Sequence, residues 1–579
     1  MLLFSGALGW HVGAGAFADW QVAVESAQVV ARLVHYPPGN PFYVYHTKLW
    51  TVLHQVLAVL LAAGFSERTL SVAVSGLLGI VSFQAVSLLT YALSGDALIA
   101  AGASALVFFT RVAEASSIYP IWLVGTSHTY GVIALSFAAL VIGFLGCGWY
   151  RTGLFLLGLA PAVHPSVGAW LILIASIVFV SDWRRLQIEL RPALPAFVAG
   201  SALTAASLVI QLLLVADVPQ VDPSTTTKYL AAFVSFWDMH RQPVELGAAT
   251  VRVNAALLVV ACFFLFRQRL ELSAPSRLLL RFVAATAALG VALAFVSWIP
   301  PDKLPPAIVI AMPGRMLNLN MLIAGPLLIG LFAGWRRTAR PAVGGVLLLI
   351  LCAALIVGNR SGLWMFDGGH RAIASAVPPV LRPNATNVVL IAMLLAIGAA
   401  WMGRQSSVAI TRLTYLATIA LMAVTLVLTW NLQRPRGFEM TDRTNDVLFR
   451  MLSDGRGLLL TGGDLHLVQL RSRRPVLLDG GGLDALPYAV ESAPEMDRIL
   501  REVYGVDLLN PPEEARFRGS IPPEFTRAVW QSYSREQWEA VASRFGVRQV
   551  LTPGDWELKL PVAVRNRGLT VYDIPDISR

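Results

Sequence analysis

The sequence predicts a polytopic α-helical membrane domain of about 11–13 transmembrane helices over residues 1–430, followed by a soluble α/β domain over residues 431–579. Of the 579 residues, 56% are hydrophobic and only 14% are charged, which is typical of a membrane protein. Apolar runs of about 20 residues, long enough to cross a bilayer, recur from Leu49 to Trp430. From Asn431 onward the composition becomes that of a soluble domain.

The two domains also differ in charge. Residues 431–579 carry 20 Lys and Arg against 21 Asp and Glu, whereas residues 1–430 carry 25 against 14. The net charge of +10 therefore divides into −1 for the soluble domain and +11 for the membrane domain. This concentration of basic residues indicates positive-inside loops and contact with membrane lipids rather than with nucleic acid.

The three cysteines, Cys147, Cys262 and Cys352, lie in or beside apolar segments at wide spacing. This spacing provides neither a disulfide framework nor a metal-ligand cluster. We interpret all three as core residues.

The predicted elements begin with Met1 to Gly9, which is too short to span, so the chain starts inside a first helix or that helix is re-entrant. Gln21 to His35 mixes apolar and polar residues as an amphipathic helix lying on the bilayer does, and Pro37-Pro38 stops it. Apolar spans are then predicted at 49–64, 70–93, 97–110, 119–146, 153–180, 192–216, 250–266, 278–299, 307–333, 341–358, 384–402 and 408–430.

Clusters of arginine orient these spans, because basic loops face the cytoplasm. They mark alternate loops and include Arg184-Arg185, Arg267 with Arg269, Arg336-Arg337 and Arg404. The first loop, 10–48, the loops 217–249, 300–306 and 359–383, and the carboxy-terminal domain are then predicted to face outward. Several long polar loops on one face predict that these loops cover and line a binding site. The alternative is that they form a solvated extracellular surface.

Asp19 is the candidate general base, because a carboxylate can accept a proton from an attacking hydroxyl group. The alternative is a helix cap, since Asp is favoured at the position before a helix. His128, with Glu114 upstream, is a second catalytic candidate that can relay a proton or bind phosphate. For His128 the alternative is a structural hydrogen bond between helices.

Two polar residues within apolar stretches are candidates for substrate binding. His164 precedes Pro165, which fits either a helix break facing a cavity or a structural kink. Arg315 follows Pro313-Gly314 and could hold a lipid-linked phosphate, or it could reach the lipid headgroups as an ordinary interfacial arginine. The outward loops supply the further substrate-binding candidates Trp20, Tyr36, Asn40, Tyr43, His370 and Arg371.

The layout of the chain resembles the GT-C class of membrane glycosyltransferases. The features that carry the resemblance are a short first membrane element, a first loop with Asp19 and a following amphipathic helix, a second polar run over 114–131, about a dozen helices and a terminal outward domain. That class includes the protein mannosyltransferases and the bacterial aminoarabinose transferases. The resemblance implies that Asp19 is the first-loop catalytic carboxylate. His128 stands at the position where the class commonly has an acidic residue.

The resemblance also implies a polyprenyl-phosphate sugar as donor, an extracytoplasmic acceptor that the sequence does not identify, and a divalent cation as a possible cofactor. It implies a bacterial inner-membrane protein with its carboxy-terminal domain in the periplasm. The alternative is a transporter or assembly partner for lipid-linked glycans that performs no chemistry. No repeated halves, which are common in transporters, are evident in the sequence.

In the carboxy-terminal domain, the pattern predicts a strand, a helix and a strand over 457–463, 465–471 and 475–480. A helix–strand pair is predicted over 537–545 and 547–552, and a last strand over 569–574. Glycine-rich turns at 461–464 and 479–482 lack the spacing of a GxGxxG or P-loop motif, so we interpret them as tight turns rather than a nucleotide site.

Overall fold

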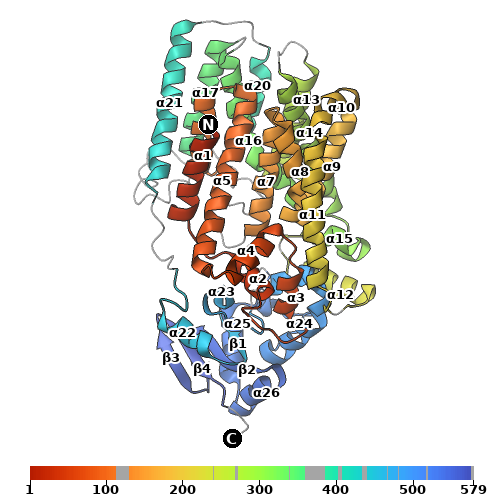
Figure 1. Ribbon diagram of the computed structural model, residues 1–579, viewed down its shortest axis with the longest axis vertical. Helices are drawn as coiled ribbons and strands as arrows, with labels where there is room; N and C mark the ends of the chain where they lie inside the picture. The colour runs from red at the N-terminus through yellow and green to blue at the C-terminus, as the bar shows by residue number, and fades with distance from the viewer. Residues whose placement is uncertain are drawn as a thin grey trace.

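The computed structural model describes residues 1–575 apart from 113–128, 219, 239, 268–271, 338–339, 359–384, 402–406, 433–439, 464, 466, 480–481 and 517–518. An elongated helical domain stands on a smaller domain that contains a sheet (Figure 1). Among the described residues, six helical stretches are long and apolar enough to cross a membrane, and shorter apolar helices pack between them. The chain is thus a helical membrane protein with a small carboxy-terminal sheet.

The helices of the larger domain are, in chain order, α1 (Leu2–Trp10), α2 (Val22–Val30), α3 (Pro41–Lys48), α4 (Val52–Ala62), α5 (Glu67–Ser94), α6 (Ala97–Thr110), α7 (Thr129–Gly146), α8 (Tyr150–Val163), α9 (Pro165–Ser181), α10 (Trp183–Leu190), α11 (Leu194–Leu214), α12 (Pro223–Phe236), α13 (Ala249–Phe266), α14 (Ala274–Val296), α15 (Pro306–Ile310), α16 (Leu317–Arg337), α17 (Pro341–Gly358), α20 (Ala385–Ala399) and α21 (Val408–Trp430).

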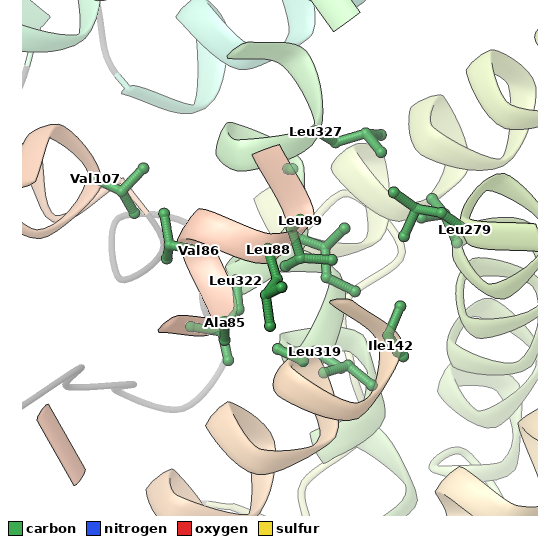
Figure 2. Close-up of a cluster of buried hydrophobic side chains, with 14 of the residues drawn as sticks. Ala85, Val86, Leu88, Leu89, Val107, Ile142, Leu279, Leu319, Leu322 and Leu327 are labelled. Carbon is green, nitrogen blue, oxygen red and sulfur yellow. The ribbon is translucent and has the colours of Figure 1, made fainter. Parts of the chain in front are cut away.

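The core of this domain forms around α16 and α5. The entire apolar window of α16 is buried inside the protein, whereas only 17% of that of α10 and α11 is buried. Leu88 and Leu89 of α5 lie near Leu319 and Leu322 of α16, with Ile142 of α7 close by (Figure 2). The peripheral helices therefore expose apolar side chains, which suits a surface in contact with lipid.

The first helix is longer than the apolar stretch Met1 to Gly9 suggests, because one turn of π-helix over His11–Ala16 continues α1. It crosses α5 at very short range. A Cβ atom at Gly9 or at Gly79 would collide with the backbone of the other helix. Small residues permit such close helix contact in membranes.

Two predictions about the amino-terminal region are wrong. The predicted span 49–64 is the 11-residue helix α4, about 16 Å long, and Lys48 before it and Glu67 after it both form ion pairs with the carboxy-terminal domain. It therefore starts and ends on one side. The predicted amphipathic surface helix is α2, and its residues Val22 to Val29 are all buried, because its polar face meets protein rather than water or lipid headgroups.

The carboxy-terminal domain has a four-stranded sheet in the order β1-β2-β4-β3, formed by β1 (Leu458–Thr461), β2 (Val547–Pro553), β3 (Val562–Asn566) and β4 (Leu569–Asp573). β1 and β2 are parallel and the other pairs are antiparallel. Its helices are α22 (Val447–Asp454), α23 (Val468–Ser472), α24 (Ala493–Ile499), α25 (Pro523–Ser532) and α26 (Arg535–Phe545). The predicted strand over 475–480 contributes only a bridge from Val476 to Leu459, and β3 was not predicted.

The two domains contact each other through buried hydrogen bonds. Tyr36 donates to Gln469 Oε1 at 2.5 Å, and Asn40 Nδ2 donates to the Leu477 carbonyl at 3.0 Å. Directly after α12, Trp237 Nε1 donates to the Leu508 carbonyl at 3.1 Å. These bonds, from the loop between α2 and α3 and from the end of α12, hold the sheet domain against one end of the helices (Figure 1).

Candidate functional site

A cavity of about 400 Å³ lies where the ends of the helices meet the carboxy-terminal domain. Five parts of the chain line it: α2 and α3, the ends of α7 and α8 nearest the carboxy-terminal domain, the loop after α12, the turn before α16, and the carboxy-terminal domain itself. Its polar lining residues are Glu25, Tyr45, His46, Tyr130, His164, His240, Arg241, Arg315, Gln469, Asp479, Asp484, Tyr488 and Ser520.

Glu25 is the carboxylate that the helical domain contributes. It sits in the first turn of α2, and its Oε1 accepts a hydrogen bond of 3.4 Å from Leu470 N of the carboxy-terminal domain. Burial and the nearby charge of Asp479 raise its pKa to about 8, while the Leu470 bond lowers it slightly. Glu25 is therefore mostly protonated at neutral pH and becomes a carboxylate just above it.

The carboxy-terminal domain adds Asp479 and Asp484. Asp484 is exposed to the cavity, yet dense protein surrounds it, and this desolvation with the charge of Asp238 raises its pKa to about 7 against the opposing effect of Arg241. Shifted pKa values in a cleft are typical of functional sites.

Two arginines lie on the other side of the cavity. Arg241 Nη1 donates to Asp238 Oδ2 at 2.5 Å, and its Nε donates to the Val309 carbonyl at 2.9 Å. Arg315 projects from a short 3-10 helix (Pro313–Met316), and its guanidinium packs so closely on Gly131 that a Cβ there would lie 3.3 Å from Nη1. Hydrogen bonds thus hold the guanidinium group of Arg241 in place, and packing against Gly131 holds that of Arg315.

Tyr488 links these arginines to the carboxy-terminal domain. Burial alone raises the pKa of its phenol, but the charges of Arg241 and Arg315 and their hydrogen bonds outweigh burial, so the pKa of Tyr488 is lowered. The guanidinium carbon of Arg241 also lies 5.5 Å from the centre of the Tyr488 ring. The two cations therefore already hold an oxygen atom between them.

A second cavity, of about 300 Å³, lies beside the first and shares His240, Arg241, Met312 and Arg315 with it. Its further lining is mainly apolar and includes Val244, Trp298, Ile299, Pro300, Leu304 and Val309. The arginine pair thus stands between a polar chamber with carboxylates and an apolar chamber. This arrangement matches a ligand with an anionic group joined to a hydrocarbon chain.

Histidines complete the polar chamber. His164 lies between α8 and α9, where its Nδ1 accepts a bond of 3.4 Å from Val167 N and caps α9. His46 Nδ1 lies 2.9 Å from Ser26 Oγ, and burial lowers the pKa of His46 to about 3, so it is neutral. Neutral imidazole in such a position can donate or accept a hydrogen bond.

Of the residues predicted from the sequence, His164 and Arg315 line the cavity. Asp19 lies outside its lining and accepts a hydrogen bond of 2.8 Å from Trp20 N. Burial lowers the pKa of Arg471 to about 10, and the charge of Asp19 is one of those that oppose this shift. Asp19 does not cap α2, because Gln21 is the residue before that helix.

The other predicted residues of the first loop have structural contacts. Trp20 is buried in a hydrophobic cluster with Ala23 and Val24. Tyr36 and Asn40 bond to the carboxy-terminal domain, and Tyr43 packs near Val44. Glu114, His128, His370 and Arg371 lie outside the described residues.

Sequence reasoning missed Glu25, Asp479, Asp484 and Tyr488 as site residues. The available signal for Glu25 was a carboxylate within a predicted helix only six residues after Asp19, and the signal for Asp479 was a glycine-rich turn after a strand. The approach of the carboxy-terminal residues to α2 depends on contacts more than 400 residues apart, which local patterns do not encode.

No protein-family model and no curated protein sequence matches this chain. Within the part of the chain that the structure describes, no group of three or more His, Cys, Asp and Glu side chains is arranged to hold a metal ion.

Proposed function

We propose that this protein is a membrane glycosyltransferase that moves a sugar from a polyprenyl-phosphate donor to an extracytoplasmic acceptor. One observation carries the proposal: the Arg241 and Arg315 pair separates an apolar chamber from a polar chamber that contains Glu25. The prenyl chain fits the apolar chamber, the phosphate fits the arginines, and the sugar fits beside the carboxylates.

In the proposed inverting reaction, the acceptor oxygen attacks the anomeric carbon from the face opposite the phosphate. The bond from that carbon to the phosphate oxygen breaks, and polyprenyl phosphate leaves with the bonding electrons. The arginines stabilise the charge that develops on the phosphate. The acceptor proton passes to a carboxylate, for which Glu25 is the candidate because it lines the cavity and ionises just above neutral pH.

The family resemblance assigns the base to Asp19, so both carboxylates need testing. Asp19 lies outside the cavity lining and Glu25 lies within it. The proposal also places the carboxy-terminal domain in the periplasm of a bacterial inner membrane. Its support is that α10 lies away from that domain (Figure 1) and carries Arg184 and Arg185, with Arg281 paired to Asp182 directly before it. Arg336 and Arg337 form the last turn of α16, at the end opposite the candidate site.

The test is transfer of labelled sugar by the purified full-length protein from a panel of polyprenyl-phosphate sugars to a mixture of cell-envelope acceptors. The parent protein should form product, and Arg315→Gln should raise the donor concentration needed for half-maximal rate. Donor binding that depends on Arg315 without product from any donor would instead favour a transporter or assembly partner for the same lipid-linked glycans.

A further inference from the structure

A third cavity lies at the opposite end of the helices, between α8, α9, α10 and α11. Its volume is about 720 Å³, larger than either chamber of the candidate active site. α9 runs from His164, which lines the active-site cavity, to Ser181 near this third cavity, a rise of about 25 Å. A ligand here is therefore separate from the donor phosphate proposed at Arg315.

The cavity has an apolar interior and a basic mouth. Leu154, Leu157, Ile172, Ala175, Phe179 and Phe197 provide the apolar walls. Trp183, Gln187 and Arg191 also line it, and Trp183 is 59% exposed. Tryptophan beside an apolar helix surface is typical of the interface between hydrocarbon and headgroups.

The charges around the mouth leave Arg191 available for an anion. The two acidic residues of this segment are already paired, Asp182 with Arg281 and Glu189 with Arg185. Arg191 is exposed, and its side chain has no hydrogen-bond or ion-pair partner in the described parts of the chain. An apolar volume below an available guanidinium complements a lipid whose headgroup is negatively charged.

We propose that this cavity is a binding site for an anionic phospholipid, with an acyl chain against α8, α9 and α11 and the phosphate on Arg191. The cavity lies beside α10 and α11, whose apolar window is only 17% buried, so the lipid can enter sideways from the bilayer. Neither the donor nor the acceptor of the proposed reaction is needed for this binding.

Native mass spectrometry of the full-length protein tests the site. The purified protein is incubated with equal amounts of phosphatidylglycerol and phosphatidylcholine that have identical acyl chains. The parent should retain phosphatidylglycerol about fivefold over phosphatidylcholine, because one surface cation favours an anionic lipid by that factor. Arg191→Gln should bring the ratio near one.

Two further variants locate the lipid. Arg412→Gln removes an exposed arginine at the same end, on α21, away from the cavity, and should keep the parent ratio. Ser176→Phe adds a ring at an exposed cavity residue and should lower retention of both lipids, and Ile172→Phe repeats this test should Ser176→Phe fail to fold. Equal retention of the two lipids by the parent, an unchanged ratio in Arg191→Gln, or unchanged retention in a folded cavity-filling variant would overturn the proposal.

Discussion

The ion pair of Arg241, at the end of the helices covered by the carboxy-terminal domain, is buried, whereas the ion pair of Arg185, at the far end, remains accessible. The side chains of Arg241 and its partner Asp238 are 6% and 0% exposed. At the far end, those of Arg185 and Glu189 are 32% and 28% exposed. Buried charges are costly unless their partners are fixed. The buried pair therefore suits the substrate-binding role that we propose for the covered end, and the accessible pair suits an end that faces lipid headgroups.

The largest expected effect concerns the carboxylate at the covered end. Glu25→Gln removes the proposed base with little change in shape and should lower the rate of sugar transfer by about 10²–10⁴-fold. Asp19→Asn, outside the cavity lining, is the matched comparison and should retain most of the rate. Initial rates at saturating donor concentration measure both effects.

The opposite result would reassign the base. A loss in Asp19→Asn with full activity in Glu25→Gln would return the catalytic role to the first-loop carboxylate. A circular-dichroism spectrum and an elution profile like those of the parent serve as the folding control for both variants.

The next effect concerns the buried ion pair. Arg241→Met leaves Asp238 buried without its cation, which should lower the free energy of unfolding by about 3–5 kcal/mol. The double variant Arg241→Met with Asp238→Leu should recover much of this loss, because it removes the uncompensated charge. Thermal unfolding in detergent measures the stability of the parent, the single variant and the double variant. A double variant no more stable than Arg241→Met would contradict the view that the uncompensated charge of Asp238 causes the loss.

Sequence patterns predicted the fold better than they predicted the site. Apolar runs predicted the long helices because each must bury or expose its own side chains to lipid. The pattern failed for 49–64, where an apolar run of spanning length contains only the short helix α4. It also failed to detect β3, whose sequence Val-Ala-Val-Arg-Asn gives a short edge strand.

For the site, His164 and Arg315 were predictable because polar residues within apolar stretches are rare and expensive. Glu25 was harder to predict, because a carboxylate on an amphipathic helix ordinarily faces water. The carboxy-terminal domain contacts α2 at this point through Gln469 and Leu470 and contributes to the burial of Glu25. Such a contact forms only when the two domains pack together, so a local pattern in the sequence does not predict it.

The third prediction concerns pH. The pKa of Glu25 is about 8 in the folded protein and 4.5 without perturbation, so between these values the folded state binds more protons than the unfolded state. The free energy of unfolding should therefore fall as the pH rises from about 4.5 to 8, by an amount on the order of a few kcal/mol. Glu25→Gln cannot ionise and should be more stable than the parent at pH 9.

The difference in melting temperature between parent and Glu25→Gln, followed from pH 5 to pH 9, isolates this contribution from those of Asp484 and His46. The rate of the parent should rise over the same range as the carboxylate forms. Parallel stability curves for the two proteins would show that Glu25 is not the buried acid described here.

The smallest effect is expected at the far end. Arg185→Met breaks the partly exposed pair with Glu189, and exposed pairs contribute only about 0–1 kcal/mol. Glu189 keeps a hydrogen bond of 3.1 Å from Tyr150, and water can solvate the rest of its carboxylate. Thermal unfolding should detect a change several times smaller than that of Arg241→Met. An equal loss of stability in Arg185→Met and Arg241→Met would mean that the accessibility of an ion pair does not determine its contribution to the free energy of unfolding. The ion pair of Arg185 would then also stabilise the packing of the helices.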